Sequence, residues 1–164
     1  MTIQKDNAGS VTLVLFSGEL DKAMAAFIIA TSAASMGMKV NIFFTFWGLN
    51  ILKKDKARFA GFNIMQRMMN FMNFGTARKL AMTKMNMAGA GPAMLKMMMG
   101  QKKVPTLPAF IKMAHEMGVK FYPCEMSMKV MGLTKEDFID ECSEVIGAVS
   151  YLSEAKDSNV NLFI

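Results

Sequence analysis

The chain has 164 residues, of which 52% are hydrophobic and 20% charged, and its formal net charge is +6. This length suffices for one domain with a full hydrophobic core, and the composition excludes intrinsic disorder. No apolar run reaches the roughly 18 residues of a membrane-spanning helix, and two cysteines exclude a framework of secreted disulfides, so we expect a cytoplasmic protein.

The N-terminal part of the chain alternates apolar strands with amphipathic helices. Residues 1–10 lack an apolar signal core and are interpreted as a polar leader. The spacing of apolar and β-branched residues then predicts, in chain order, a buried strand at 11–17, a helix at 19–35, a strand at 39–46, a turn at 47–48 and a helical piece at 49–54.

Residues 61–104 differ in composition and are interpreted as a methionine-rich helical insertion within a single domain spanning residues 1–164. Residues 61–100 carry eleven of the 20 methionines and are punctuated by glycines, which predicts short amphipathic helices. Ten Lys or Arg residues and no Asp or Glu occur from Lys56 to Lys112, so the basic character of the chain is concentrated here.

Three interpretations of this basic segment remain open. Methionine side chains are flexible and polarisable, so they suit an interface between subunits of a homo-oligomer, a peripheral contact with a membrane surface, or the packing of an inserted subdomain. We favour the homo-oligomer. Copper binding would need a regular Met-x-x-Met array with histidine, and the scarcity of aromatic residues among the basic ones argues against nucleic acid.

The C-terminal part resumes the regular alternation. The predicted elements are a helix from the N-cap Thr106 to Gly118, a strand at 119–123, a short helix from Glu125, a short helix at 134–140 with a capping box of Thr134 and Asp137, a short strand at 145–146, a helix at 148–155 and a last strand at 159–164. Strands that alternate with helices pair in parallel through right-handed crossovers. We therefore predict an α/β fold with three α/β/α layers, in which helices cover both faces of a mostly parallel sheet of about five strands.

Ligands of such sheets bind beyond the carboxyl ends of the strands. Three junctions should meet there: Ser17-Gly18-Glu19, Thr45-Phe46-Trp47-Gly48 and Pro123-Cys124-Glu125. Cys124 is the main candidate for catalysis, because N–H groups at the start of a helix favour the thiolate, which is the nucleophilic form. The carboxylate of Glu125 either raises the thiol pKa or only favours the helix start, and we prefer the second interpretation.

Other residues at these junctions are candidates for lining a pocket around the cysteine. Phe46 and Trp47 either cover the cysteine or simply cap the core, and Gly48 forms the turn beside them. Ser17 and Gly18 are placed to offer backbone N–H groups to an anion or a persulfide.

Two further residues are interpreted as structural. Cys142 lies in the acidic stretch 140–144, where negative charge disfavours the thiolate. His115 is the only histidine, so the chain has no zinc pattern, and its place near the end of the predicted helix from Thr106 to Gly118 argues against a role as a catalytic base. No G-x-G-x-x-G or Walker pattern follows the first strand, and we expect no metal and no cofactor.

Four segments form a fairly specific combination: KVNIFFTFWGL at 39–49, KMNMAG at 84–89, CEMSMKVMGL at 124–133 and the ending NLFI at 161–164. Together they resemble the DsrE/DsrF/DsrH-like superfamily, and more closely its branch of stand-alone DsrE-like proteins with a methionine-rich insertion. The resemblance covers nearly the whole chain from residue 11. It implies a Rossmann-like α/β/α domain, usually oligomeric, that relays sulfur through a cysteine persulfide. The sulfur-carrying cysteine of the family matches Cys124, whereas Cys142 matches no motif position.

The sequence therefore leads to one main hypothesis and one rival. In the main hypothesis, the protein is a sulfur carrier or sulfurtransferase-like protein whose Cys124 takes sulfane sulfur from a donor protein and passes it to an acceptor protein. In the rival, it is a non-catalytic interaction module or membrane-surface adaptor that uses the methionine-rich basic segment, while Cys124 is inert.

Overall fold

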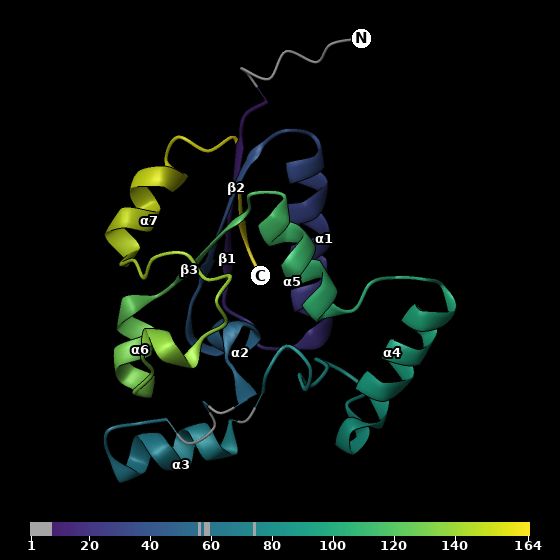
Figure 1. The fold of residues 1–164 in the computed structure, drawn as a ribbon, viewed down its shortest axis with the longest axis vertical. Helices are drawn as coiled ribbons and strands as arrows, with labels where there is room; N and C mark the ends of the chain where they lie inside the picture. The colour runs from purple at the N-terminus through teal and green to yellow at the C-terminus, as the bar shows by residue number, and fades with distance from the viewer. Residues whose placement is uncertain (1–7, 56, 58–59, 74) are drawn as a thin grey trace.

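A computed structural model describes residues 8–55, 57, 60–73 and 75–164 (Figure 1). At its centre lies a sheet of four parallel strands in the order β3-β2-β1-β4. The strands are β1 (Ser10–Leu15), β2 (Lys39–Phe44), β3 (Lys120–Pro123) and β4 (Val160–Phe163). The predicted polar leader falls mainly on residues 1–7, which lie outside the described residues.

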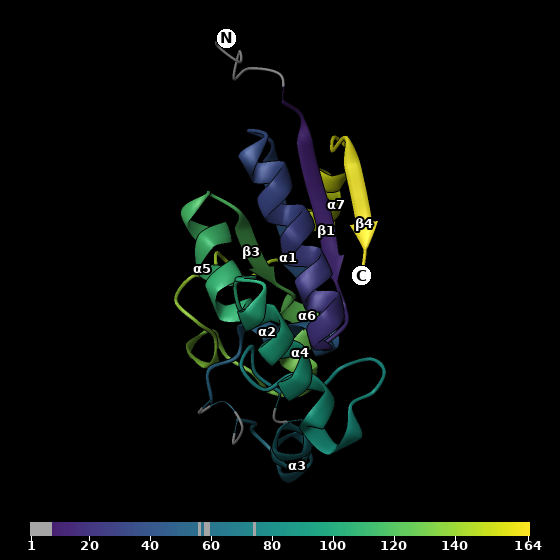
Figure 2. The same cartoon turned by 90° about the vertical axis from the view of Figure 1, so that its right-hand side faces the viewer.

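Helices cover both faces of the sheet, as predicted. α1 (Leu20–Ser35) and α5 (Leu107–Glu116) pack on one face, and α7 (Ala148–Ala155) packs on the other, while Figure 2 shows β4 at the edge beside β1. Successive residues of a strand point to opposite faces. Phe44 therefore joins the main core under α1 and α5, whereas Phe43 joins a second, smaller cluster under α7.

The parallel α/β architecture is confirmed, with four strands in the described ranges instead of about five. The expected short strand at 145–146 forms only an isolated bridge, in which Ile146 pairs with Cys124. The Ile146 N–H donates to the Pro123 carbonyl at 3.1 Å, and the Ile146 carbonyl accepts from the Glu125 N–H at 3.0 Å. The ladder stops there because Gly147, the next residue, is already the N-cap of α7.

Short elements follow the carboxyl ends of the strands: η2 (Phe46–Gly48), α2 (Leu49–Leu52), α6 (Glu125–Met131) and η5 (Lys135–Asp137). The predicted capping box is present, since the Thr134 N–H donates to Asp137 Oδ2 at 2.8 Å, but it starts a single 3₁₀ turn rather than a helix to residue 140. Thr106 precedes α5 as predicted, although its hydroxyl makes no capping hydrogen bond.

The methionine-rich segment, residues 61–104, contains α3 (Ile64–Met72), η4 (Met87–Gly89) and α4 (Ala90–Gln101). Figure 1 shows α3 beyond the carboxyl ends of the strands and α4 projecting to one side. No helix in the described ranges is long and apolar enough to span a bilayer.

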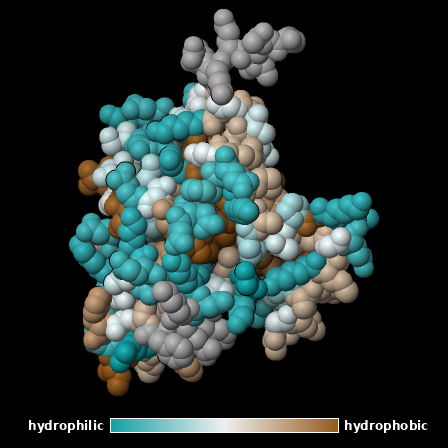
Figure 3. All heavy atoms as spheres, in the orientation of Figure 1, coloured by the Kyte–Doolittle hydropathy of each residue, from teal (hydrophilic) through white to brown (hydrophobic). Residues whose placement is uncertain are grey.

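α3 turns its polar side toward the domain. The buried Asn70 donates from Nδ2 to the Met131 carbonyl at 2.7 Å, and Gln66 Nε2 donates to the carbonyls of Lys129 and Val130, both at 3.2 Å. These carbonyls lie in the last turn of α6, where carbonyls lack the regular i+4 donor of a helix, and that of Lys129 also accepts from the Gly132 N–H at 3.3 Å. The other side of α3 carries exposed apolar residues: Ile64, Met65, Met68, Phe71 and Met72. Apolar surface is visible in Figure 3 at the lower end of the molecule, where Figure 1 shows α3.

Candidate functional site

Backbone hydrogen bonds join the predicted junctions along one edge of the sheet. The Cys124 N–H donates to the Phe44 carbonyl at 2.9 Å, and the Thr45 N–H donates to the Leu15 carbonyl at 3.1 Å. The junctions after β1, β2 and β3 therefore lie side by side, as the parallel order requires. This edge is where parallel α/β sheets bind their ligands.

Cys124 ends β3 and is the N-cap of α6, with extended backbone angles (φ −75°, ψ 118°). Its thiol is free and makes no capping hydrogen bond. Only 6% of the residue is exposed, because it belongs to the cluster on the α7 face together with Phe43, Tyr122 and Tyr151. The sequence predicts the position of this cysteine between strand and helix, but it gives no sign of the burial.

Two helices start beside Cys124. α6 begins at Glu125, and α7 begins after Gly147, where a Cβ would lie 4.0 Å from Glu125 Oε2. The bridge between Cys124 and Ile146 holds the two helix starts together. Since the N-terminus of each helix carries partial positive charge, both favour an anion near the cysteine.

The acidic neighbour of Cys124 has a partner of its own. Glu125 Oε1 lies 2.6 Å from Lys129 Nζ, one helical turn further along α6, and both side chains are largely exposed. This pairing agrees with the interpretation that Glu125 favours the helix. On the other side of the cysteine, burial and the charges of Glu154 and Glu144 raise the pKa of Tyr122, so its phenol stays neutral.

A second polar contact links the end of β2 to α6. The hydroxyls of Thr45 and Ser127 lie 2.8 Å apart, and Ser127 is only 1% exposed. This hydrogen bond fixes α6 against the strand next to Cys124. Sequence analysis did not identify Ser127, and neither did it identify Phe43 or Tyr151, because their proximity to Cys124 depends on how α6 and α7 pack.

The aromatic pair Phe46 and Trp47 lies toward β1 rather than toward β3. The Phe46 ring packs 5.7 Å from the Phe16 ring, and a Cβ at Gly18 would lie 3.2 Å from the Trp47 Cβ. Both aromatic residues are partly exposed at the sheet edge, and Phe46 has a left-handed backbone (φ 46°), which is strained for a residue other than glycine. Their contacts thus place them on the β1 side of the edge, with Cys124 on the β3 side.

The two glycines at these junctions permit close contact between backbones. A Cβ at Gly18 would lie 2.7 Å from the Trp47 carbonyl oxygen, and a Cβ at Gly48 would overlap the Leu15 carbonyl. A larger residue at either position would push apart the chain segments that follow β1 and β2. Their role in the structure is to let these junctions approach.

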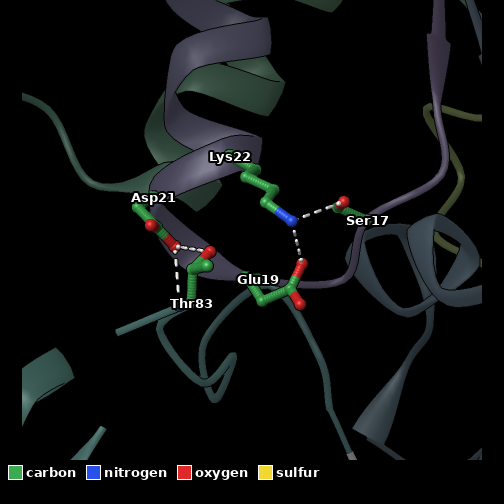
Figure 4. Close-up of polar contacts among 5 residues, drawn as sticks. All are labelled: Ser17, Glu19, Asp21, Lys22 and Thr83. Atoms are coloured by element: carbon green, nitrogen blue, oxygen red, sulfur yellow. Dashed lines mark hydrogen bonds and ion pairs between the residues drawn. The ribbon is translucent and has the colours of Figure 1, made fainter. Parts of the chain in front are cut away.

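Ser17 is buried and is engaged in a polar network at the start of α1 (Figure 4). Lys22 Nζ donates to Ser17 Oγ at 3.2 Å and lies 3.5 Å from Glu19 Oε2. Asp21 Oδ1 accepts from the Thr83 N–H at 3.0 Å and from its hydroxyl at 3.1 Å. Burial raises the pKa of Asp21, but the hydrogen bonds from Thr83 and from the backbone N–H groups of Asp21 and Lys22 together outweigh this effect, so the pKa lies below its usual value.

The start of α1 is therefore covered by the chain itself. The Leu20 N–H donates to the Ala81 carbonyl at 2.7 Å, and the Ser17 N–H donates to the Ile164 carbonyl at 3.2 Å. The sequence predicts that the N–H groups at Ser17 and Gly18 bind an anion. Of these two, the Ser17 N–H already donates to the carbonyl of Ile164. The first N–H of α6 is engaged in the same way, because the Glu125 N–H donates to the Ile146 carbonyl at 3.0 Å.

Cys142 is unsuited to act as a thiolate at neutral pH. Burial, reinforced by the nearby carboxylates of Glu141 and Asp140 and opposed by Lys54, raises its pKa to about 12. Its side chain packs against the main core, on the other side of the sheet from the cluster of Cys124.

We expect Cys142 to react with iodoacetamide at about pH 8 at least about tenfold more slowly in the native protein than in urea, because unfolding returns its pKa toward 9.0. A Cys124→Ser variant isolates this thiol, and peptide mass spectrometry follows its alkylation. Equal rates in the native and unfolded states would contradict this assignment.

The fold and its edge define a class: a parallel α/β/α protein that presents a cysteine between a strand end and a helix start. The sequence model that describes the DsrE/DsrF/DrsH-like family matches residues 7–163. The chain therefore belongs to this family.

Two relatives extend this assignment. The chain is 44% identical to an uncharacterized protein, YrkE, of Bacillus subtilis (strain 168), over 93% of this chain and 95% of that protein. It is 31% identical to a protein of Allochromatium vinosum named sulfur carrier protein DsrE2, over 94% of this chain and 97% of that one. The family therefore includes a sulfur carrier that aligns with nearly the whole chain.

Solved structures share the fold at low sequence identity. A protein of unknown function from Methanobacterium thermoautotrophicum has a TM-score of 0.56 at 8% identity, covering 94% of this chain and 98% of that one. The ychN protein from E. coli has a TM-score of 0.53 at 7% identity, covering 95% and 99%. These similarities support the α/β architecture.

Proposed function

We propose that this protein carries sulfane sulfur as a persulfide on Cys124. The observation that carries the proposal is the position of this free thiol at the carboxyl edge of a parallel sheet, where α6 and α7 both begin. The name of the DsrE2 relative, sulfur carrier protein, supports the same chemistry. Cys142 is the poorer candidate for the carrier, because burial raises the pKa of its thiol and disfavours the thiolate.

The relay consists of two thiol exchanges that need no oxidant. The Cys124 thiolate attacks the outer sulfur of a donor persulfide, R–S–SH, so that a new S–S bond forms on Cys124 and the donor leaves as R–S⁻. An acceptor thiolate then attacks the outer sulfur of Cys124–S–SH. It takes that sulfur and its proton, and Cys124 leaves as a thiolate again.

The surroundings of Cys124 suit both the anion and the persulfide. The starts of α6 and α7 stabilise negative charge on sulfur as it is released. The apolar cluster around Phe43 and Tyr151 keeps water and competing thiols from the carried sulfur. The same burial makes access to Cys124 depend on movement of the covering side chains.

The proposal is tested by incubating the protein with polysulfide, removing the excess and measuring the intact mass. We expect a gain of one sulfur atom per chain, which a reducing agent then removes. A wild-type protein whose mass never increases would refute the proposed carrier role.

We expect a Tyr151→Ala substitution to accelerate modification of Cys124 by at least about tenfold. The Tyr151 ring stacks on Phe43 at 4.9 Å and belongs to the cluster that buries the cysteine, so its loss opens that cluster. Leu152→Ala, one residue further in α7 and 61% exposed, is the matched control and should leave the rate unchanged. Mass spectrometry measures the rate of alkylation of Cys124 in each variant. Identical rates in the two variants would show that Tyr151 does not control access to the cysteine.

A second candidate function, self-association, is favoured by the outward apolar face of α3. Ile64, Met68 and Phe71 line a groove of about 440 Å³ together with Arg67. Exposed apolar surface of this kind is uncommon on a monomer. We propose that a second copy of the chain covers this face, with the flexible methionines adapting to one another and basic side chains at the rim.

A further inference from the structure

A cleft of about 430 Å³ lies on the α5 face of the molecule. Its apolar wall includes Ile51 and Ile111, which belong to the main core, whereas Cys124 belongs to the cluster on the opposite face of the sheet. The cleft is therefore separate from the candidate sulfur site. None of the proposed roles of Cys124 or of α3 accounts for it.

Basic side chains from separate parts of the chain converge on this cleft. They come from the end of α2, from the loop before η4 and from α5: Lys53, Lys54, Arg78 and Lys112. Two carboxylates also line it, those of Asp55 and Glu141, and Asp55 already accepts a hydrogen bond from Thr76 at 3.0 Å. The balance of charge is positive, which concentrates anions in the cleft.

The ion pairs of these cations are weak. Lys54 Nζ lies 2.8 Å from Asp140, but that carboxylate is 93% exposed. Lys112 Nζ lies 3.8 Å from Glu116, and both side chains are exposed, so water screens the attraction. No ion pair joins the Arg78 guanidinium to any residue in the described part of the chain. These side chains are thus available to a ligand.

Lys53 adds a buried positive charge behind the cleft. Only 3% of this residue is exposed, and its Nζ donates to Asn50 Oδ1 at 3.3 Å, Asn70 Oδ1 at 3.4 Å and the Asn73 carbonyl at 3.2 Å. Burial lowers the pKa of Lys53 to about 8, with the charge of Asp137 opposing the shift. A buried cation held by neutral groups is costly, and an anion in the cleft would offset that cost.

A second cavity, of about 320 Å³, adjoins the cleft. The two share Ala77, Arg78 and Pro108, and the second adds the apolar side chains of Leu107 and Met99. Arg78 therefore lies where a charged space meets an apolar one. A ligand that filled both would need an anionic group joined to an apolar body.

We propose that the two cavities bind a small organic oxyanion, with Arg78 and Lys112 holding the oxyanion group while Leu107 and Pro108 contact the apolar body. A guanidinium presents two parallel N–H donors, which match the oxygens of a carboxylate or a phosphate ester. Both groups share this chemistry, so the probes below include one of each.

Calorimetric titration with phenyl phosphate, benzoate and inorganic phosphate tests the proposal. Phenyl phosphate or benzoate should bind saturably and more tightly than inorganic phosphate, because only the first two carry an apolar body. Arg78→Met and Lys112→Met should each weaken binding about tenfold, the effect of one lost charged hydrogen bond. Lys120→Met is the matched control at the opposite, amino end of β3, and it should leave the affinity unchanged.

Three results would overturn the proposal. The first is the absence of saturable binding by both organic probes. The second is equal weakening by Lys112→Met and Lys120→Met, which would mean that diffuse charge attracts the anion. The third is equal affinity for inorganic phosphate and the organic probes, which would exclude a role for the apolar cavity. A Cys124→Ser variant should bind like the wild type, so this test is independent of the sulfur site.

Discussion

A Cys124→Ser variant is expected to take up no sulfane sulfur from polysulfide, whereas a Cys142→Ser variant is expected to load like the wild type. The reason is that only Cys124 lies between a strand end and two helix starts, whose partial positive charge attracts anionic sulfur, while the raised pKa of Cys142 keeps that thiol protonated. Intact mass after polysulfide treatment measures the uptake in all three proteins.

The two substitutions control for each other, because each removes one thiol and retains the other. Ser has nearly the size of Cys, so the substitution opens no large cavity in the buried cluster around position 124. Equal loading of the wild type and the Cys124→Ser variant would reject the assignment of the carrier. Loss of loading in Cys142→Ser alone would transfer the role to that residue.

A triple substitution of Met65, Met68 and Met72 by Glu is expected to convert a stable homo-oligomer into monomers. These residues are 73%, 59% and 71% exposed on α3, so the described part of the chain leaves most of their surface uncovered. Three carboxylates at a buried interface would lose their hydration and repel their copies in the partner. Light scattering measures the mass, and circular dichroism checks that the sheet remains folded.

The matched control replaces three exposed methionines outside α3, Met36, Met117 and Met126, by Glu. It makes the same change of charge and should leave the assembly intact. Met69 is not substituted, because it packs against the main core and a charge there would weaken the attachment of α3. A monomeric wild type would reject self-association, and co-sedimentation of the wild type with anionic liposomes would favour the membrane-surface alternative.

The sequence correctly predicts which segments meet at the carboxyl ends of the strands, because the patterns that define a strand are local. Apolar runs predict the three strands 11–17, 39–46 and 119–123, and parallel pairing alone brings their carboxyl ends together. The fourth predicted strand, at 145–146, fails for a local reason that the pattern does not contain. Ile146 makes one bridge, and Gly147 then starts α7.

What the sequence does not predict depends on contacts between distant segments. The spacing of methionines predicts an amphipathic α3 but not that its polar side faces inward, which follows from the bonds of Gln66 and Asn70 to the carbonyls that end α6. The burial of Cys124 likewise depends on Tyr151 in α7. The sequence does not distinguish Lys53 from the other basic residues, because its burial among three asparagines depends on the fold.

The central claim is that Cys124 both receives sulfur and passes it on. Its most direct test is a chase: wild-type protein loaded with isotopically labelled polysulfide is freed of excess reagent, mixed with glutathione and sampled over time by peptide mass spectrometry. We predict that label appears on the peptide of Cys124, then leaves it while labelled glutathione persulfide accumulates in equal amount. Label that resides elsewhere, or that stays on Cys124 while glutathione remains unlabelled, would contradict the relay.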